Sequence, residues 1–379
     1  MKRVELPNKN GCNFRINSDS ILPISEEIEE FITLEPSLKK IKFKNQIPKD
    51  IQSNNIIEGI DDDLEAIRRI IVRKIIYDIS RDSSDKEKKV LNLYKAYKYI
   101  LEKKEINKEN LRTLYRLISD GLILPRDQEC MGEYYREDEV CISNLAYFDE
   151  RIMGIPFKDV SKYVDYLMEY VKNTKAENYT DNFIISQIIH FYLIFIHPYF
   201  DCNGRTSRTV AMWYLLNNNA NAFLNFNRAI PFTKSKYNKS INSSRDTSDL
   251  TYFIKYMLEM EKKQLEKEYL ISSIERSRGK NFTDDEYLLL EYFLSNKQSQ
   301  SLKSLTDLFT TVNGSKMKVS EVASKLESFM KSGLIIQIGS TKTLLNDGTP
   351  NPILRLNADM FDFNRDRVKT LDLSNYLNK

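Results

Sequence analysis

Apolar side chains recur with helical spacing along most of the chain. The most apolar run extends from Phe183 to Ile196, and a second apolar run ends at Leu216. Side chains that repeat about every third or fourth position lie on one face of a helix and bury that face in a core. The same spacing predicts further helices at 49–57, 64–71, 90–100, 111–123, 157–173 and 252–280. The pattern therefore predicts a mostly α-helical protein.

Other patterns interrupt the helices. Residues 132–147 alternate charged, aromatic and β-branched side chains, which predicts a short hairpin. The first 47 residues contain prolines at positions 7, 23 and 36, so we expect an irregular lead-in with short helical pieces. Near the end of the chain, three short helical patterns precede two strand patterns, at 284–295, 304–310, 319–330, 333–339 and 352–356.

These segments suggest a division of the chain into parts. We expect an N-terminal region at 1–85 with a helix at about 48–59, a helical core at 86–262, a connector helix at 263–282, a small domain at 283–358 and a tail at 359–379.

Composition restricts the class of protein. Of the 379 residues, 41% are hydrophobic, which is sufficient for buried cores. The 57 basic and 54 acidic residues give a net charge of +3, so no extended polyanion-binding surface is expected. The four cysteines are scattered and the apolar runs are too short to span a bilayer, so we expect a cytoplasmic protein without disulfides. With two histidines, a zinc site is not expected, and His190 should be a hydrogen-bonded core residue.

A polar loop, His-Pro-Tyr-Phe-Asp-Cys-Asn-Gly-Arg-Thr-Ser-Arg, separates the two most apolar helices. If the second helix starts near Asn203, the backbone N–H groups of Cys202, Asn203 and Gly204 point out of its first turn. Such N–H groups and the helix dipole favour an anion, and phosphate is the anion we expect. Arg205 and Arg208 are three positions apart and share a helix face, so both can reach successive phosphates of one ligand.

Other side chains of the loop add chemistry. Asp201 is placed to hold a Mg²⁺ ion that bridges the phosphates, because a hard cation prefers carboxylate and phosphate oxygens. His197 is the loop's only group that titrates near neutral pH, and it could take a proton from a hydroxyl that attacks phosphorus. Cys202 lies at a helix N-terminus near two arginines, so we expect its thiol to have a lowered pKa and to react with electrophiles.

This loop resembles the signature of the Fic family, His-Pro-Phe-x-(Asp or Glu)-Gly-Asn-Gly-Arg-x-x-Arg. Members of that family typically transfer AMP from ATP to a protein hydroxyl. Two positions depart from the signature: Tyr199 stands where phenylalanine is usual, and Cys202 stands where a glycine or alanine is usual.

The resemblance implies a role for each matching side chain. His197 would be the general base, and Asp201 would be the Mg²⁺ ligand. Asn203 and the neighbouring backbone amides would form the anion hole. Arg205 would contact the α- and β-phosphates of ATP, and Arg208 would contact the γ-phosphate.

Residues 54–59, Asn-Asn-Ile-Ile-Glu-Gly, are similar to the inhibitory motif of many Fic proteins, (Ser or Thr)-x-x-x-Glu-(Gly or Asn). Asn54 occupies the position of the hydroxyl residue. A glutamate against the phosphate site would pair with an arginine and deny it to the γ-phosphate. We expect Glu58 to pair with Arg208 in this way. The alternative is an ordinary helix C-terminus with a solvated glutamate.

Two further features resemble the family. Residues 135–142 match the pattern Tyr-Arg-x-x-x-Val-x-Ile of a flap that covers the active site and pairs with a target segment, which gives Val140, Cys141 and Ile142 a docking role. Tyr237 lies where the family places a tyrosine near adenine, and an aromatic face suits a purine. The alternatives are a plain surface hairpin and a packed tyrosine without a ligand.

The predicted elements after residue 283 have the order of a winged helix-turn-helix domain, which some long Fic proteins carry at this end. DNA binding is disfavoured, because the predicted helix at 319–330 carries two glutamates and no arginine to read guanine or grip phosphate. A module for protein interaction or packing is favoured.

The sequence thus predicts a mostly α-helical Fic-type core with a small β-hairpin flap and a C-terminal winged-helix-like domain. The predicted function is an autoinhibited protein adenylyltransferase that uses ATP and Mg²⁺ and modifies a Ser, Thr or Tyr hydroxyl of a target protein or of itself. Two alternatives stay open: a hydrolase that removes AMP, with Glu58 positioning water, and a DNA-binding regulator with a vestigial core. A homodimer is also left open.

Overall fold

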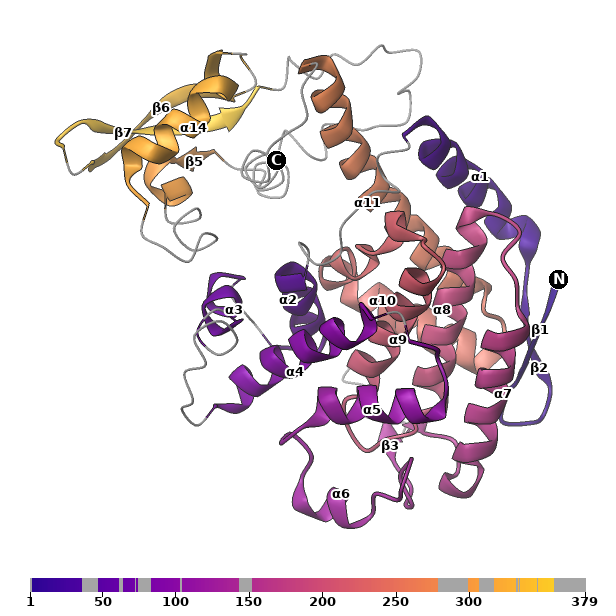
Figure 1. The fold of residues 1–379 in the computed structure, drawn as a ribbon. Coiled ribbons are helices and arrows are strands. Elements are labelled where there is room, and N and C mark those ends of the chain that lie inside the picture. The colour runs from indigo at the N-terminus through magenta and orange to yellow at the C-terminus, as the bar shows by residue number, and fades with distance from the viewer. Residues whose placement is uncertain are drawn as a thin grey trace. The chain divides into compact units, whose positions relative to one another are not determined.

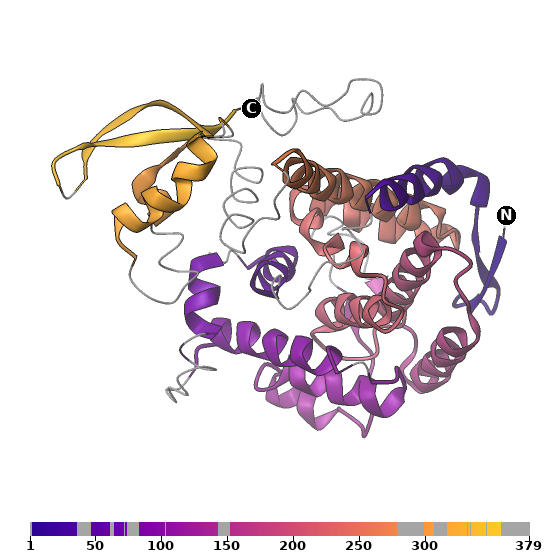
Figure 2. The same ribbon diagram turned by 45° about the horizontal axis from the view of Figure 1, so that its top comes forward.

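The computed structural model describes residues 2–35, 47–60, 64–71, 73, 83–102, 104–142, 152–278, 299–306, 317–331, 333, 335–345 and 347–357. The chain divides into two compact units, Met1–Leu265 and Glu266–Lys379. Helices dominate the first unit, and the second combines a small sheet with helical segments (Figure 1 and Figure 2). The prediction of a mostly α-helical fold is confirmed.

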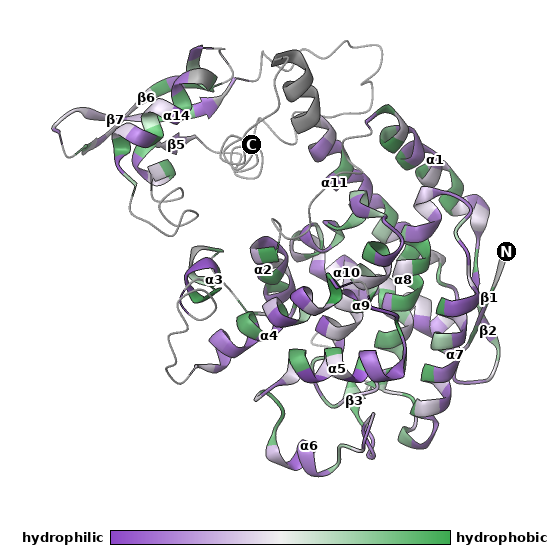
Figure 3. Cartoon of the chain, in the orientation of Figure 1, coloured by the Kyte–Doolittle hydropathy of each residue, from purple (hydrophilic) through white to green (hydrophobic). Residues whose placement is uncertain are grey.

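The first unit is built around α8 (Tyr179–Ile196) and α9 (Asn203–Asn217), which pack against each other. Most side chains of α8 are buried, on all faces of the helix. Figure 3 shows the predominantly apolar character of α8. α8 begins before the predicted apolar run because Asn178 and Asp181 form a capping box, in which each side chain accepts from the other residue's backbone N–H.

The other helices of the first unit surround this pair. The helices predicted between residues 49 and 280 are present, with ends shifted by a few residues. Within the described ranges, no helix combines the length and apolar character needed to cross a membrane. These helices and 3-10 turns are α3 (Leu64–Ile71), α4 (Asp85–Ile100), α5 (Lys108–Ser119), α6 (Pro125–Glu129), η4 (Phe157–Asp159), α7 (Val160–Asn173), η5 (Asn221–Phe223), η6 (Phe226–Arg228), η7 (Ile230–Thr233) and α10 (Lys234–Thr247). Helix α11 (Thr251–Arg278) belongs to the first unit as far as Leu265.

The N-terminal segment is more regular than the sequence predicted. Strands β1 (Lys2–Pro7) and β2 (Asn13–Ile16) pair antiparallel. Phe14 of β2 is fully buried and packs edge-on against Phe191 and Phe195 of α8, with ring centroids 5.4 and 5.1 Å apart. This tertiary contact stabilises a hairpin that a two-stranded pair could not form alone in water.

Helix α1 (Ser18–Leu34) also contradicts the expected irregular lead-in. Pro23 lies inside this helix, where it lacks the N–H for one helical hydrogen bond. The helix persists because it buries Ile21, Ile28 and Ile32 against the core, and each fully buried side chain contributes roughly 1.5–3 kcal/mol.

Helix α2 (Ile47–Ile57) corresponds to the helix predicted at about 48–59. Gly59 ends it with a φ of 84°, the left-handed conformation that favours glycine. The backbone N–H of Gly59 and that of the next residue donate to the carbonyls of Ile56 and Asn55, both at 2.9 Å, which is the Schellman pattern. This closed turn fixes the backbone of Glu58, which lies inside it.

The strands of the hairpin predicted at 132–147 lie later in the sequence than this range suggests. Strand β3 is only Cys141–Ile142, and it pairs antiparallel with β4 (Ile152–Met153), which lies outside the predicted stretch. Residues 132–138 are mostly bends, with a single antiparallel bridge between Arg136 and Met131 in place of a strand. The reason is that Arg136 turns inward to bind backbone carbonyls, as described below.

The second unit contains a three-stranded antiparallel sheet in the order β5-β7-β6, and a helix, α14, packs against it. Strand β5 was not predicted, and β6 extends beyond the predicted strand. The predicted helix at 284–295 lies outside the described residues, so the winged-helix arrangement stays a prediction. The bounds are β5 (Gln300–Ser301), α14 (Val319–Lys331), β6 (Ile335–Leu344) and β7 (Pro350–Leu356).

Candidate functional site

The loop between α8 and α9 is held in one shape by its own residues. His197 and Cys202 adopt left-handed backbone conformations, with φ of 52° and 64°, at the end of α8 and the start of α9. The side-chain amide of Asn203 accepts a hydrogen bond from the N–H of Tyr199 at 3.0 Å and donates one to its carbonyl at 2.7 Å. The Asn203 side chain therefore fixes the loop, and its backbone N–H, not its amide, is left for an anion.

His197 is neutral and oriented. Its Nδ1 lies 3.3 Å from the carbonyl oxygen of Ile194, which requires that Nδ1 carry the proton and leaves a lone pair on Nε2. Burial lowers the pKa of His197 to about 4, although the Ile194 contact and the carboxylates of Glu58 and Asp201 act in the opposite direction. A neutral imidazole in this orientation can accept a proton at neutral pH.

The first turn of α9 faces a site that suits an anion. A Cβ atom added to Gly204 would lie 2.5 Å from Oε1 of Glu58. The carboxylate therefore comes so close to the backbone that only a glycine leaves room for it. Arg205 is 4% exposed, and its Nε and Nη1 have no hydrogen-bond partner among the described residues. Buried N–H groups are rarely left unpaired, so an anion here would supply missing acceptors.

Arg208 binds the Glu58 carboxylate directly. Its Nη2 lies 2.5 Å from Oε1 of Glu58, and the guanidinium is almost fully buried. Burial acts to raise the pKa of Glu58, but attraction to Arg208, Arg205 and Lys234 outweighs it, so the pKa is lower than usual. Glu58 is therefore ionised, and the fold brings it together with Arg208 from 150 positions away.

Asn54 forms a second contact with Arg208. Its Oδ1 accepts a hydrogen bond from Nε of Arg208 at 2.5 Å. Its amide nitrogen donates to Oδ2 of Asp50 at 2.9 Å and to the hydroxyl of Tyr97 at 2.8 Å. Asp50 and Asn54 lie on one face of α2, and Glu58, four residues further on, follows directly after the helix end on the same side.

Asp50 anchors this face of α2, and sequence analysis missed it. It is 1% exposed and accepts hydrogen bonds from the hydroxyl of Tyr97 and, at 3.0 Å, from the amide of Asn227. Burial raises its pKa, and these two hydrogen bonds only partly oppose the rise. An acidic residue in a first helical turn usually indicates solvent exposure. The four-residue spacing of Asp50, Asn54 and Glu58 is the sequence pattern that could have identified Asp50 as part of the site.

Asp201 is exposed just outside the first turn of α9, and its Oδ1 accepts the N–H of Cys202 at 2.5 Å. Mg²⁺ is commonly bound by one or two protein carboxylates together with substrate phosphates. A single exposed carboxylate beside an anion site therefore fits this ion. Across the residues described, no three His, Cys, Asp or Glu side chains gather into a metal cluster.

The prediction of a reactive Cys202 with a lowered pKa is wrong. The residue is 3% exposed and belongs to the hydrophobic core. Burial raises the pKa of its thiol to about 12, and the opposing effect of Arg205 is smaller. Proximity to a helix N-terminus does not produce a thiolate when the sulfur is removed from water.

Tyr237 is buried beside Arg208. Its ring is 3% exposed and packs against His190, Phe253 and Tyr256. Its hydroxyl lies 2.9 Å from Nε2 of His190 and beside the Arg208 guanidinium. The packed tyrosine without a ligand, which was the alternative, agrees with this burial, and the adenine contact of Tyr237 stays a prediction. The expectation that His190 is a hydrogen-bonded core residue is confirmed.

Arg136 joins the flap to the loop. It is 1% exposed and donates to the carbonyls of His197 at 2.9 Å, Asp138 at 2.6 Å and Ile155. These contacts tie the chain before β3 to the end of α8. This arginine belongs to the flap pattern in the sequence, but the pattern predicted no role for it.

Among the described residues, strand β3 pairs with β4 on one edge and with no strand on the other. Val140 is buried, Cys141 is exposed and Ile142 is partly exposed. The N–H of Gly154 donates to the carbonyl of Val140 at 3.1 Å, so the next pair, Cys141 with Met153, is of the type without mutual hydrogen bonds. The N–H and C=O of Cys141 therefore point away from β4, on the side where a further strand could pair.

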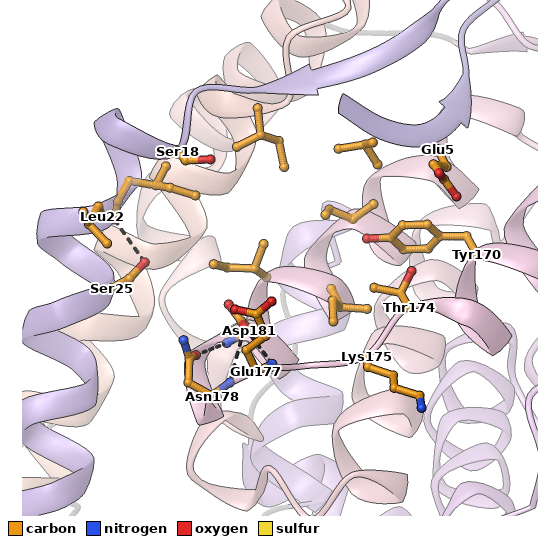
Figure 4. A pocket seen from close by; sticks show the side chains of 16 residues that line it. Glu5, Ser18, Leu22, Ser25, Tyr170, Thr174, Lys175, Glu177, Asn178 and Asp181 are labelled. Carbon is orange, nitrogen blue, oxygen red and sulfur yellow. Dashed lines mark hydrogen bonds between the residues drawn. The ribbon is translucent and has the colours of Figure 1, made fainter. Parts of the chain in front are cut away.

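A cavity of about 400 Å³ lies at the other end of α8. Figure 4 shows Glu177 and Asn178 at its wall, each hydrogen-bonded to Asp181. Isoleucines of α8 form the apolar side of the cavity. α8 has 18 residues, so its two ends are about 27 Å apart. This cavity is separate from the loop that carries His197.

Comparisons with known proteins show what this chain resembles. Residues 105–215 match the model of the Fic/DOC family. A Fic family protein from Desulfovibrio desulfuricans G20 has a similar solved structure, with 20% identity and a TM-score of 0.53 over 89% of this chain and 96% of that chain. A fragment of Fic-1 from C. elegans is 15% identical, with a TM-score of 0.47 over 67% of this chain and 72% of its own. At this level of identity, the first likeness shows the fold alone.

The matched segment ends within α9 and includes the whole loop with His197, Asp201 and both arginines. This chain therefore contains a Fic/DOC family domain.

Proposed function

We propose that this chain is a protein adenylyltransferase, which transfers AMP from ATP to a Ser, Thr or Tyr hydroxyl of a target protein. The observation that carries the proposal is the anion site at the N-terminus of α9. There, Arg205 has buried N–H groups without described partners, and the Glu58 carboxylate lies against Gly204. Backbone N–H groups, a helix dipole and arginines together favour phosphate.

The proton in this reaction goes to Nε2 of His197. As the target oxygen forms a bond to the α-phosphorus, its proton passes to Nε2, and the bond from the α-phosphorus to the bridging oxygen breaks with pyrophosphate as the leaving group. Arg205 and the first N–H groups of α9 stabilise the charge on the phosphates. Asp201 would hold Mg²⁺, which supplies further positive charge when bound.

We further propose that Glu58 inhibits this reaction. The Arg208 guanidinium contacts Glu58 through Nη2 and Asn54 through Nε. A guanidinium engaged in this way cannot also grip the γ-phosphate of ATP. The reaction therefore requires the C-terminal end of α2 to move, while the edge of β3 away from β4, at Cys141, would align the target segment.

The test uses the full chain and the Glu58→Gly variant, each incubated with ATP labelled at either the α- or the γ-phosphorus, with and without cell lysate. AMP transfer predicts protein-bound label from α-labelled ATP and none from γ-labelled ATP. Label from the γ position alone would identify phosphoryl transfer. No protein-bound label in either protein from either position would overturn the proposal.

A further inference from the structure

Lys234 approaches the anion site from a part of the chain outside the loop. It is the first residue of α10 and follows η7, which packs against α2. Its Nζ lies 3.8 Å from the position of a Cβ atom built on Gly59. Since Gly59 directly follows Glu58, the ammonium group lies at the same end of α2 as the carboxylate that occupies the anion site.

The Lys234 ammonium group has no fixed partner. In the part of the chain that the structure describes, it donates no hydrogen bond and forms no ion pair within 4.0 Å. Its charge nevertheless acts on Glu58, because Lys234 joins Arg208 and Arg205 in lowering the pKa of that carboxyl. An ammonium on a flexible four-carbon stem can turn its three donors toward whichever anion is present.

We propose that Lys234 is the third cation of the anion site and that it binds the terminal phosphates of ATP when Glu58 leaves. This inference rests on the proposed function. Arg205 and Arg208 both belong to α9, whereas Lys234 comes from α10 and faces the end of α2. A triphosphate carries more negative charge than one carboxylate, so a third cation with no fixed partner matches ATP better than it matches Glu58.

The same charge also stabilises Glu58 in its inhibitory position. In the wild-type protein, removing Lys234 would weaken both the inhibitory contact and the phosphate contact, so the two effects oppose each other in any activity assay. Binding measured in a Glu58→Gly background isolates the phosphate contact, because that variant has no carboxylate at this place.

The experiment measures dissociation constants of ATP and AMP by calorimetry, with Mg²⁺ present, for the full-length Glu58→Gly protein and for variants built on it. We expect Lys234→Ala to weaken ATP binding by about tenfold, the loss typical of one hydrogen bond to a charged group. AMP binding should be unchanged, because AMP lacks the terminal phosphates. Lys234→Arg should bind ATP as the parent does. Lys236→Ala, an exposed lysine of the same helix, is the matched control and should leave both constants unchanged.

Each other outcome has a distinct meaning. If Lys234→Ala binds ATP as tightly as the parent, the role of Lys234 is overturned and the proposed function stands. Equal weakening for ATP and AMP would place Lys234 away from the terminal phosphates and also overturn the inference. A Glu58→Gly parent that binds no ATP would overturn both the inference and the proposed function.

Discussion

Asn54 and Arg208 are 154 positions apart in the sequence, yet Oδ1 of Asn54 accepts a hydrogen bond from Nε of Arg208 at 2.5 Å. Glu58 binds a different nitrogen of the same guanidinium. A side chain of α2 and one just after its end therefore hold one arginine of α9. An amide at this position provides an acceptor for Arg208 and, through its nitrogen, a donor for the buried Asp50.

Asn54→Ala should weaken both the fold and the inhibition. The change leaves Asp50 and Nε of Arg208 each without one partner, and an unpaired buried polar group costs about 1–3 kcal/mol. We expect the free energy of unfolding in urea to fall by about that amount and self-labelling with α-labelled ATP to rise. Ser53→Ala is the control, because among the described residues the Ser53 hydroxyl donates only to the carbonyl of Lys49 in its own helix, and this change should affect neither value strongly. A destabilised Asn54→Ala protein that labels at the wild-type rate would exclude Asn54 from inhibition.

Glu58→Gly should raise the rate of self-labelling by about 10-fold or more, because it removes a charge-assisted contact worth roughly 1.5–3 kcal/mol from Arg208. Arg208→Ala should be inactive, since it lacks the γ-phosphate contact whether or not Glu58 is present. The double variant should therefore be as inactive as Arg208→Ala. Initial rates for the four proteins decide the matter. A Glu58→Gly rate at or below the wild-type rate would favour the hydrolytic alternative, in which Glu58 positions water.

His197→Ala, made in the Glu58→Gly protein, should slow AMP transfer by about 10²- to 10⁴-fold and leave the dissociation constant of ATP unchanged. The pH profile of the parent gives an independent check. Because the pKa of His197 is lowered to about 4, the imidazole is neutral above that pH, and the rate should lose this base only as the pH falls toward 4. A rate that declines with a midpoint near 6.5 would show that the pKa of His197 is not lowered, and equal rates for variant and parent would remove it as the base.

Cys202 should resist alkylation in the folded protein. Its thiol is buried and its pKa is raised to about 12, whereas Cys12 and Cys141 are exposed. Brief treatment with iodoacetamide, followed by peptide mass mapping, should modify the two exposed cysteines and leave Cys202 unmodified until denaturant is added. Modification of Cys202 as fast as Cys12 in the native protein would contradict its burial.

Tyr199→Phe should stabilise the protein by about 1 kcal/mol. The Tyr199 hydroxyl is buried without a hydrogen-bond partner among the described residues, and its ring stacks on Tyr115 with centroids 3.5 Å apart. Removing an unpaired buried hydroxyl relieves its desolvation cost and keeps the stack. Tyr192→Phe is the matched control, because the Tyr192 hydroxyl donates to the carbonyl of Pro7 at 2.9 Å, and its loss should lower the free energy of unfolding by about the same amount. Destabilisation of both variants would mean that the Tyr199 hydroxyl is paired.

The sequence by itself determined the helices of the core and the chemistry of the loop. Helical spacing of apolar residues depends on short-range geometry, so α4, α7 and α9 could be located from one stretch of chain each. His197, Asp201 and the two arginines lie within twelve consecutive residues, and their spacing alone indicated an anion site at a helix N-terminus.

Only the tertiary structure decided which of these side chains are buried and what they contact. Burial raised the pKa of Cys202 where local reasoning predicted a lowered one, and it placed Tyr237 inside the core, which its sequence position did not indicate. The contacts of Asp50 with Asn227 and of Phe14 with α8 likewise join segments far apart in the chain. Desolvation and contacts of this kind depend on atoms brought in by distant segments, and no local pattern encodes them.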